Sequence, residues 1–206
     1  MGRRNFTIAA ASALVVLAGL WQGMSPLQAR ANTHVQHAAF TTIDPNVDSP
    51  PAGGQLCLNG NPGVNCNIYT DKQFVWLNGG PAAAALGDGT YFFAVLEPGG
   101  QGGGSSGDPN DGTAKNLSSP FDDYTNRTFT VSASAVLYGG SHDQDGNLIR
   151  LMPYGDTGNP GGVYIMAICS LADAPEAGIA SLPGVNPSDC KYDAFKIQAC
   201  ASSCEP

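Results

Sequence analysis

Gly89-Thr90-Tyr91-Phe92-Phe93-Ala94-Val95 decides the fold class, because the chain repeats its pattern at Gly162-Val163-Tyr164-Ile165-Met166-Ala167-Ile168. Both stretches read glycine, any residue, tyrosine, two apolar residues, alanine and a β-branched residue. Unbroken apolar runs of this kind are typical of strands covered on both faces. We expect two central strands that follow glycine turns, with each tyrosine hydroxyl bonded to nearby backbone. A shared packing demand explains the likeness more simply than a duplicated half-domain.

The other apolar segments are short and are separated by turn residues, among them 27 glycines and 15 prolines in the whole chain. Low helix propensity together with this punctuation predicts an all-β domain. Phe129 and Val131 alternate with threonines, which is typical of a strand with one solvated face. We expect a β-sandwich of about seven strands. The expected strands are Gln55–Leu58, Gln73–Leu77, Thr90–Glu97, Arg127–Tyr138, Asn147–Met152, Val163–Ser170 and Lys191–Gln198.

Residues 1–31 have the marks of a secretory signal peptide. Arg3 and Arg4 precede an apolar run from Phe6 to Trp21, and Ala29-Arg30-Ala31 matches the small-residue cleavage pattern. The run is short for a membrane span, so an uncleaved anchor is the weaker alternative. The paired arginines also fit part of a twin-arginine export signal. We expect a secreted protein, extracellular or periplasmic, with no membrane insertion after cleavage.

Cleavage after Ala31 would leave 175 residues with six basic and 17 acidic side chains, a net charge of −11. So acidic a surface argues against nucleic acid and anionic lipid as partners, and it is compatible with divalent cations. We expect residues 32–54 to be an extended N-terminal segment. Residues 55–206 would form a single β-sandwich domain, with a glycine-rich loop at 98–120.

Four of the six cysteines have evident partners by position. Cys57 and Cys66 flank a turn-rich loop, which predicts a bond that closes a hairpin. Cys169 ends one expected strand and Cys190 begins the next, which predicts a bond that clamps the loop between them. Such a bond contributes about 3 kcal/mol in the chain-entropy model.

Cys200 and Cys204 remain at the tail. They pair with each other, or one of them reaches back to Cys57 or Cys66. The chain has no Cys-x-x-Cys and no histidine near a cysteine, which argues against a zinc or redox site.

The sequence shows no recognisable catalytic motif. Ser141-His142-Asp143 contains the residue types of a catalytic triad, but contiguous side chains cannot converge as nucleophile, base and orienting acid. No Gly-x-Ser-x-Gly turn occurs, and Asp122-Asp123 is the one adjacent acid pair. We therefore expect no enzymatic activity and no organic cofactor.

Asp143, Asp145 and Asn147 offer oxygen ligands at alternate positions, as calcium loops do. The competing interpretation is a plain hairpin turn at Asp145-Gly146 between two apolar strands. A second acidic region could complete a calcium site if the loops meet. It consists of Asp108, Asn110, Asp111, Asp122 and Asp123.

Asp122, Asp123 and Tyr124 are the candidate ligand-binding residues, since Tyr124 lies in a polar loop beside two acids. An aromatic platform for sugars would draw on four side chains, although Trp76 lies in an apolar stretch that favours the core. The four are Trp76, Tyr124, Tyr138 and Tyr154.

The string Leu86-Gly87-Asp88-Gly89-Thr90-Tyr91 resembles the start of a strand in prealbumin-like, collagen-adhesin B-type modules of bacterial surface proteins. About 120 residues, from Phe74 to Lys196, also look like modules of uncharacterised secreted bacterial proteins. The resemblance implies an immunoglobulin-like or prealbumin-like β-sandwich. Many adhesin modules carry a Lys–Asn cross-link between the first and last strands. Lys72 suits the first strand, but Lys191–Gln198 contains no asparagine.

These observations predict a disulfide-stabilised, non-catalytic structural or adhesion protein at the cell exterior. Its partner would be an extracellular protein or a glycan. A carbohydrate-binding module assisted by calcium is the first alternative, and a small secreted hydrolase is the second. A deep pocket that holds His142 with a carboxylate from another segment would favour the hydrolase.

Overall fold

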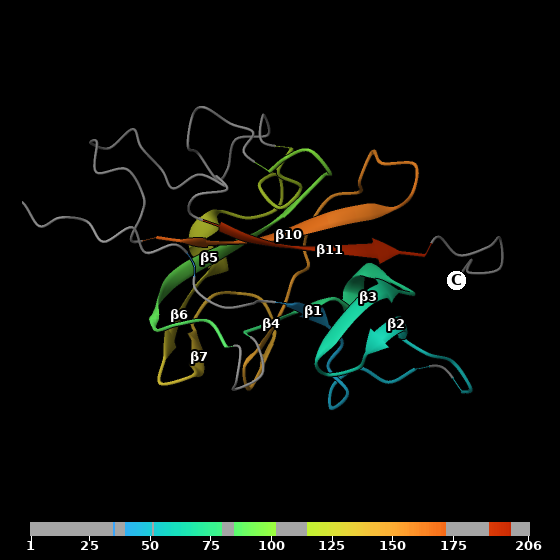
Figure 1. Ribbon diagram of the computed structural model, residues 1–206, viewed down its shortest axis with the longest axis horizontal. Helices are drawn as coiled ribbons and strands as arrows, with labels where there is room; N and C mark the ends of the chain where they lie inside the picture. The colour runs from blue at the N-terminus through green and yellow to red at the C-terminus, as the bar shows by residue number, and fades with distance from the viewer. Residues whose placement is uncertain are drawn as a thin grey trace, which may run out of the picture. The chain divides into compact units, whose positions relative to one another are not determined.

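The computed structural model describes Val35 and residues 40–50, 52–79, 85–101, 115–171 and 190–198. All of them lie within Asn32–Pro206. They form an all-β domain built from two sheets (Figure 1), as predicted. Among these residues there is no helix of the length and hydrophobicity that crossing a membrane requires.

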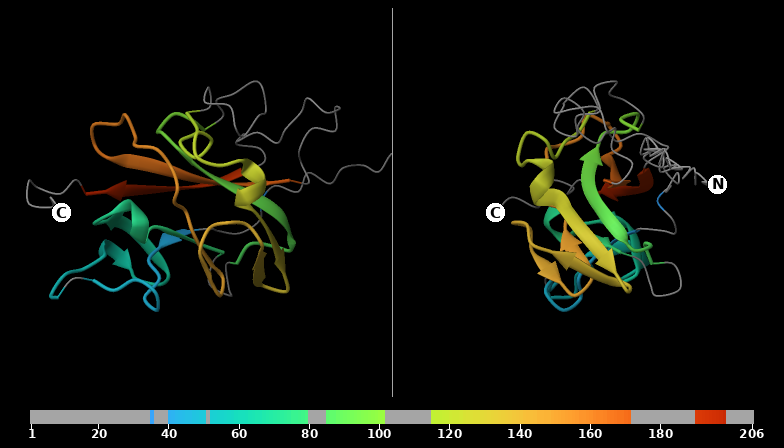
Figure 2. Two further views of the ribbon diagram at one scale, coloured as in Figure 1. Left: turned by 180° about the vertical axis from the view of Figure 1, so that it is seen from behind. Right: turned by 90° about the vertical axis from the view of Figure 1, so that its left-hand side faces the viewer.

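The larger sheet has seven strands, and its neighbours are antiparallel except for the short parallel contact of β11 with β3. Figure 2 shows it from two further directions, with β5 in green beside β6 in yellow. In spatial order the strands are β2 (Cys57–Asn61), β3 (Asn65–Tyr69), β11 (Cys190–Ile197), β10 (Val163–Ser170), β5 (Gly89–Leu96), β6 (Thr128–Ser132) and β7 (Ala135–Tyr138).

The smaller sheet has four antiparallel strands. In order they are β1 (Phe40–Thr42), β4 (Trp76–Asn78), β9 (Leu148–Arg150) and β8 (Gln144–Asp145). Two short 3-10 helices precede strands: η1 (Lys72–Phe74) before β4 and η3 (Tyr124–Arg127) before β6. Asp71 and Asp123 cap them by accepting a backbone N–H two residues on.

The two look-alike strands, β5 and β10, are direct antiparallel neighbours, with Ile165 opposite Leu96 and Ser170 opposite Tyr91. All of 91–96 and 164–170 is buried, which confirms two strands covered on both faces. Tyr91 donates its hydroxyl to the Gly87 carbonyl over 2.8 Å, as expected. The two glycines serve different needs. Gly162 has φ +66°, whereas a Cβ on Gly89 would lie 3.1 Å from the Tyr91 hydroxyl.

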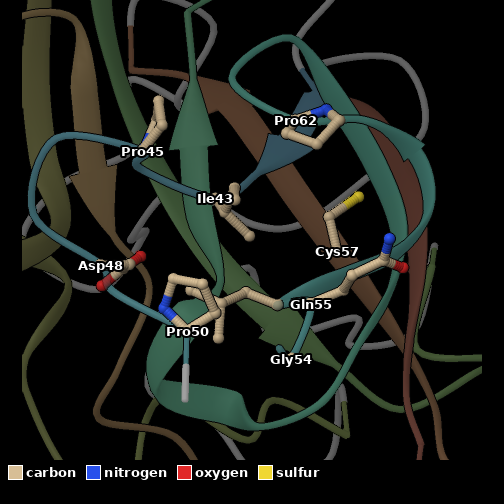
Figure 3. Close-up of a pocket in the computed structure, with 9 residues that line it drawn as sticks. Ile43, Pro45, Asp48, Pro50, Gly54, Gln55, Cys57 and Pro62 are labelled. Atoms are coloured by element: carbon tan, nitrogen blue, oxygen red, sulfur yellow. The ribbon is translucent and has the colours of Figure 1, made fainter. Parts of the chain in front are cut away.

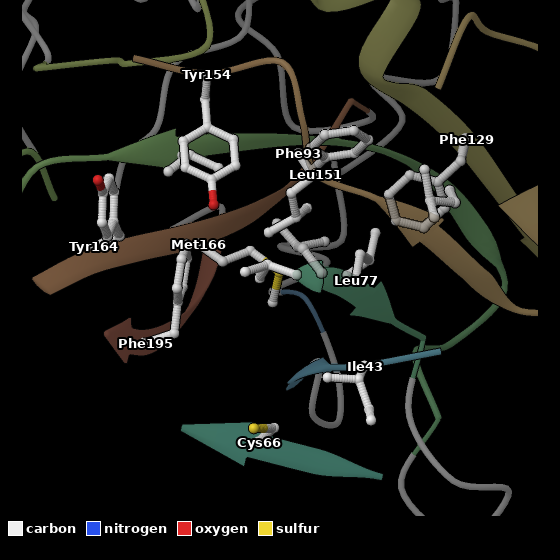
Figure 4. Packing of buried hydrophobic residues seen from close by; sticks show 14 of the residues in the cluster. Ile43, Cys66, Leu77, Phe93, Phe129, Leu151, Tyr154, Tyr164, Met166 and Phe195 are labelled. Carbon is white, nitrogen blue, oxygen red and sulfur yellow. The ribbon is translucent and has the colours of Figure 1, made fainter. Parts of the chain in front are cut away.

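The main core lies on one side of this central pair. At one end Tyr164 stacks on Phe195, with ring centroids 5.2 Å apart, and Tyr154 meets Tyr164 edge-on (Figure 4). Phe93 and Phe129 fill the other end. A second buried cluster covers the opposite face of β5 and β10, where Phe92, Ala94 and Leu96 meet Ile165, Ala167 and Cys169.

Both predicted strand-linking disulfides form. Cys57–Cys66 joins β2 to β3, and Cys169–Cys190 joins directly opposed residues of β10 and β11. Each bond therefore fastens a strand pair of the larger sheet. Cys200 and Cys204 lie outside the described residues, as do Asp108, Asn110 and Asp111.

The single strand expected over Arg127–Tyr138 is wrong: this segment is a hairpin. β6 ends at Ser132 and β7 begins at Ala135, and the two turn residues have positive φ, 50° at Ala133 and 66° at Ser134. Neither is the glycine or asparagine that usually marks such a turn, so no local pattern predicts a hairpin here. The segment expected to be extended, 32–54, contributes β1, and β3 was not expected. The described residues thus hold eleven strands rather than about seven.

Side chains from one sheet satisfy the edge of the other. Asn147 accepts the Val136 N–H of β7 over 2.9 Å and donates to the Ser134 carbonyl, while Gln144 donates to the Val136 carbonyl. On the other side, Asp193 of β11 accepts the Thr41 N–H of β1 over 2.7 Å. These amides and the carboxylate act as substitutes for a neighbouring strand, so the edges of β7 and β1 are tied across the two sheets.

The strained turn predicts opposite effects for two serines. Ser134→Gly should raise Tm by about 2–4 °C, since glycine adopts positive φ without the Cβ penalty and relief of about 1 kcal/mol shifts a domain of this size by that amount. Ser132→Gly, two residues earlier in extended β6, should lower Tm instead. Thermal unfolding of both variants checks this, and an equal response would contradict the assigned turn.

Asp193 predicts a pH-dependent contribution to stability. Burial raises the pKa of Asp193, although the two hydrogen bonds from Thr41 lower it. A carboxyl whose folded pKa is raised stabilises the fold below its unfolded pKa and loses that contribution as pH rises through the folded value. Asp193→Asn lacks this loss, so its Tm relative to wild type should be higher at about pH 7 than at about pH 3. Thermal melts of both proteins at each pH measure the Tm of Asp193→Asn minus that of wild type. A value that falls as the pH rises would contradict the prediction.

Candidate functional site

His142 pairs with a carboxylate from another segment. Its Nε2 lies 2.7 Å from Oδ2 of Asp122, and its Nδ1 lies 2.9 Å from the carbonyl oxygen of Arg150. The His142 side chain is 0 % exposed and that of Asp122 is 7 % exposed. The Phe93 ring meets the imidazole edge-on at 5.1 Å. Both ring nitrogens are therefore engaged inside the protein.

Arg127 completes this buried polar cluster. Its Nε lies 3.0 Å from Oδ1 of Asp122, and its NH1 donates to the Phe93 carbonyl over 2.8 Å. Burial lowers the pKa of Arg127, while the adjacent Asp122 opposes that effect. The guanidinium thus links η3 to β5, and Asp122 balances its charge. The cluster has the carboxylate that would favour a hydrolase, but the imidazole does not open into a pocket, so the geometry is that of an internal brace.

The candidate ligand-binding residues do not form one surface. Asp122 points into the buried cluster. Asp123 caps η3 by accepting the N–H and the hydroxyl of Thr125. Tyr124 is half-buried and packs edge-on against Phe92, 6.1 Å between centroids.

The three expected calcium ligands also diverge. Asp143 pairs with Nε of Arg150 over 3.0 Å, and Asn147 bonds β7. Asp145 accepts from Nδ2 of Asn46 over 3.0 Å. The segment itself is a β8–β9 hairpin that turns at Gly146, φ +53°. The backbone of this segment is therefore the hairpin turn that was the competing interpretation. Of Asp143, Asp145 and Asn147, Asp145 is the one with a recorded contact to the loop after β1.

That loop, Asp44-Pro45-Asn46-Val47-Asp48, was not considered from the sequence. Asp44 and Asp48 are buried, and Asp44 accepts the N–H groups of Asn46 and Val47 through Oδ1. Oxygen-bearing side chains at alternate positions, Asp44, Asn46 and Asp48, are the pattern that could have indicated a calcium loop. The segment lacks the glycine that usually accompanies this pattern. Burial raises the pKa of Asp44, and the carboxylate of Asp145 adds to the effect.

Asp48 holds this loop against the smaller sheet. It accepts from Nε1 of Trp76 over 2.6 Å and lies 3.4 Å from NH2 of Arg150. The Arg150 guanidinium stacks 4.4 Å from the Trp76 ring, and it also reaches the Gln73 carbonyl. Trp76 is therefore a core residue, 1 % exposed, and not a sugar platform.

A hollow of about 260 Å³ opens beside the same loop. Figure 3 shows Pro45, Pro50 and Pro62 around it, with Ile43 at its base. Asp48 and Gln55 supply polar groups at the wall. Small-molecule sites start at about 300 Å³, so this hollow matches one inserted side chain or a small ring.

Other aromatic candidates are also engaged. Tyr154 is 2 % exposed, and Tyr138 is half-buried and contacts the Asn126 carbonyl and the His142 N–H. Lys72 lies in η1, where it donates to the Tyr154 carbonyl and to Asp156. Among the described aromatic residues, Phe121 is the exposed one, at 55 %, and the sequence did not single it out.

Within the described ranges, no three His, Cys, Asp or Glu side chains are grouped closely enough to hold a metal ion. No protein-family model, curated protein or solved structure matches the chain.

Adjacent aspartates should differ sharply in their effect on stability. Asp122→Ala leaves a buried guanidinium without its counter-charge, so it should cost about 3–5 kcal/mol of unfolding free energy. Asp123→Ala removes a helix cap and should cost about 1 kcal/mol. Denaturant unfolding of the two variants measures both losses. Equal losses would mean that Asp122 is not the brace of the cluster.

Proposed function

We propose that this protein is an exported, non-catalytic structural or adhesion module that recognises an extracellular protein or glycan. The observation that carries the proposal is the closed state of the His142 cluster. An acid–base catalyst must reach a substrate, whereas this imidazole is fully covered and has both nitrogens engaged.

The disulfides support a role outside the cytoplasm. Disulfides persist in oxidising compartments. Here one bond fastens β2 to β3, and the other fastens β10 to β11. The signal-like residues 1–31 and the acidic composition agree with export. The resemblance to prealbumin-like adhesin modules stays part of the proposal.

The hollow beside the loop Asp44–Asp48 is the surface that we propose for recognition. It is walled by prolines, whose fixed backbone needs little ordering on binding. It also lies on a loop held by Asp48, Trp76 and Arg150, so its shape is set before a partner arrives. A partner side chain of apolar or aromatic character fits its lining.

A carbohydrate-binding module assisted by calcium is the second candidate. The approach of Asp145 to the Asp44 loop favours it. The burial of Trp76 and Tyr154 removes two of its four expected stacking residues.

Binding screens test the proposal. The exported protein, immobilised, should give saturable binding on a glycan array or a panel of extracellular-matrix proteins. Gln55→Trp should fill the hollow and weaken that binding by about tenfold or more, equivalent to about 1.4 kcal/mol. Gln101→Trp, an exposed glutamine outside the lining, is the matched control.

Hydrolysis would overturn the proposal. If the purified protein cleaves ester, glycoside or peptide substrates, and folded His142→Gln loses that activity, the His142 cluster is catalytic and the hydrolase alternative is correct.

A further inference from the structure

Two acidic loops, about a hundred residues apart in sequence, come into contact, although β1 and β8 are the opposite edge strands of the smaller sheet. The loop after β1 supplies Asp44 and Asp48, and the β8–β9 segment supplies Asp143 and Asp145. Asn46 bridges them through its contact with Asp145. The guanidinium of Arg150 pairs with one carboxylate from each segment, Asp48 and Asp143.

Two of the four carboxylates are compensated. Asp48 receives the Trp76 indole N–H and lies beside Arg150, and Asp143 pairs with Arg150. Arg150 thus balances the charges of Asp48 and Asp143, and Asp48 anchors the loop to the smaller sheet. Asp44 and Asp145 have no such positive partner in the described contacts.

Asp44 differs from Asp48 and Asp143 because one of its carboxylate oxygens has no hydrogen-bond donor. The residue is 0 % exposed, and its Oδ2 is buried without a hydrogen-bond donor. Asn46 contacts both this carboxylate and that of Asp145: its backbone N–H donates to Oδ1 of Asp44 over 2.8 Å, and its Nδ2 donates to Oδ2 of Asp145 over 3.0 Å. A buried carboxylate oxygen without a donor, in a loop that meets a second carboxylate, is destabilising unless a cation compensates its charge.

We propose that a calcium ion binds between Asp44 and Asp145. Oδ2 of Asp44 and the Asp145 carboxylate supply the charged ligands. The Asn46 amide, whose Nδ2 donates to Asp145 in this structure, would turn over so that Oδ1 supplies a neutral oxygen to the ion. Calcium takes six to eight oxygens, so water and backbone carbonyls complete its shell.

The ligand count sets the affinity class. Two carboxylates make a weak site, in the range of about 10⁻⁴–10⁻³ M that is typical of extracellular modules. The physiological importance of such a site rests on the proposed export, because calcium reaches millimolar levels outside cells. Binding itself does not depend on export or adhesion and is measured separately.

The first experiment is a thermal melt of the full chain in about 10 mM CaCl₂, in EDTA, and in NaCl of matched ionic strength. Calcium should raise Tm by about 3–10 °C over the other two conditions. Trp76 gives a second readout, because it donates to Asp48 in the same loop. In a Trp21→Phe background it is the chain's remaining tryptophan, and its fluorescence should change on titration with calcium alone.

The variants separate the site from its surroundings. Asp44→Asn and Asp145→Asn should each abolish the calcium response. Because each also removes the repulsion, their Tm in EDTA should equal or exceed that of wild type, which a purely structural role would not produce. Asp143→Asn, in the same hairpin but paired with Arg150, is the matched control and should keep the response.

Two results would overturn the proposal. One is the absence of any Tm or fluorescence change up to 10 mM CaCl₂, which would leave a shared proton as the way the two carboxyl groups coexist. The other is a calcium response that survives both Asp44→Asn and Asp145→Asn. Either outcome leaves the binding screen with Gln55→Trp unaffected, so failure here is distinguishable from failure of the proposed function.

Discussion

The antiparallel pairing of β5 with β10 is the constraint that the rest of the structure must satisfy. Both strands present apolar side chains on each face, so neither face can meet water. One face is covered by the main core, toward which β4 and β9 contribute Leu77 and Ile149. The other face carries the second cluster around Phe92 and Ile165. A single sheet exposed to solvent would leave these apolar faces in contact with water. The fold therefore needs a second layer against the β5–β10 pair.

Once two sheets face each other, their outer strands need partners for backbone groups. The protein uses side chains from the opposite sheet: Asn147 and Gln144 at β7, and Asp193 at β1. This arrangement hides strand edges that would otherwise invite association. It also explains why several polar residues that look like ligands in the sequence are structural. Asn147 and Asp122 both satisfy internal groups, and their removal is expected to affect folding first.

A buried carboxylate oxygen without a hydrogen-bond donor, Oδ2 of Asp44, lies in the loop after β1. Asp48 is fixed by Trp76 and Arg150, and its Oδ2 accepts the Asp44 N–H over 3.3 Å. Asp44 is buried in the same loop, and Asn46 links it to Asp145. The proline-walled hollow adjoins the same loop. Pro45 and Asp48 of this loop line the hollow. The two proposals thus concern neighbouring features but rest on separate observations.

The sequence by itself determined the all-β class, the two doubly covered strands and the disulfides Cys57–Cys66 and Cys169–Cys190, because burial period and cysteine position are local signals. It did not reveal the turn at Ala133-Ser134, because these residues adopt positive φ without being the usual turn residues, and the contacts that they make there, with Asp88 and Asn147, come from distant segments. Only the tertiary structure decided that His142 meets Asp122 and that Asp145 meets Asn46 of the Asp44 loop. These pairs join segments whose separation is fixed by sheet order, and no local pattern encodes which loops the packing of two sheets will bring together.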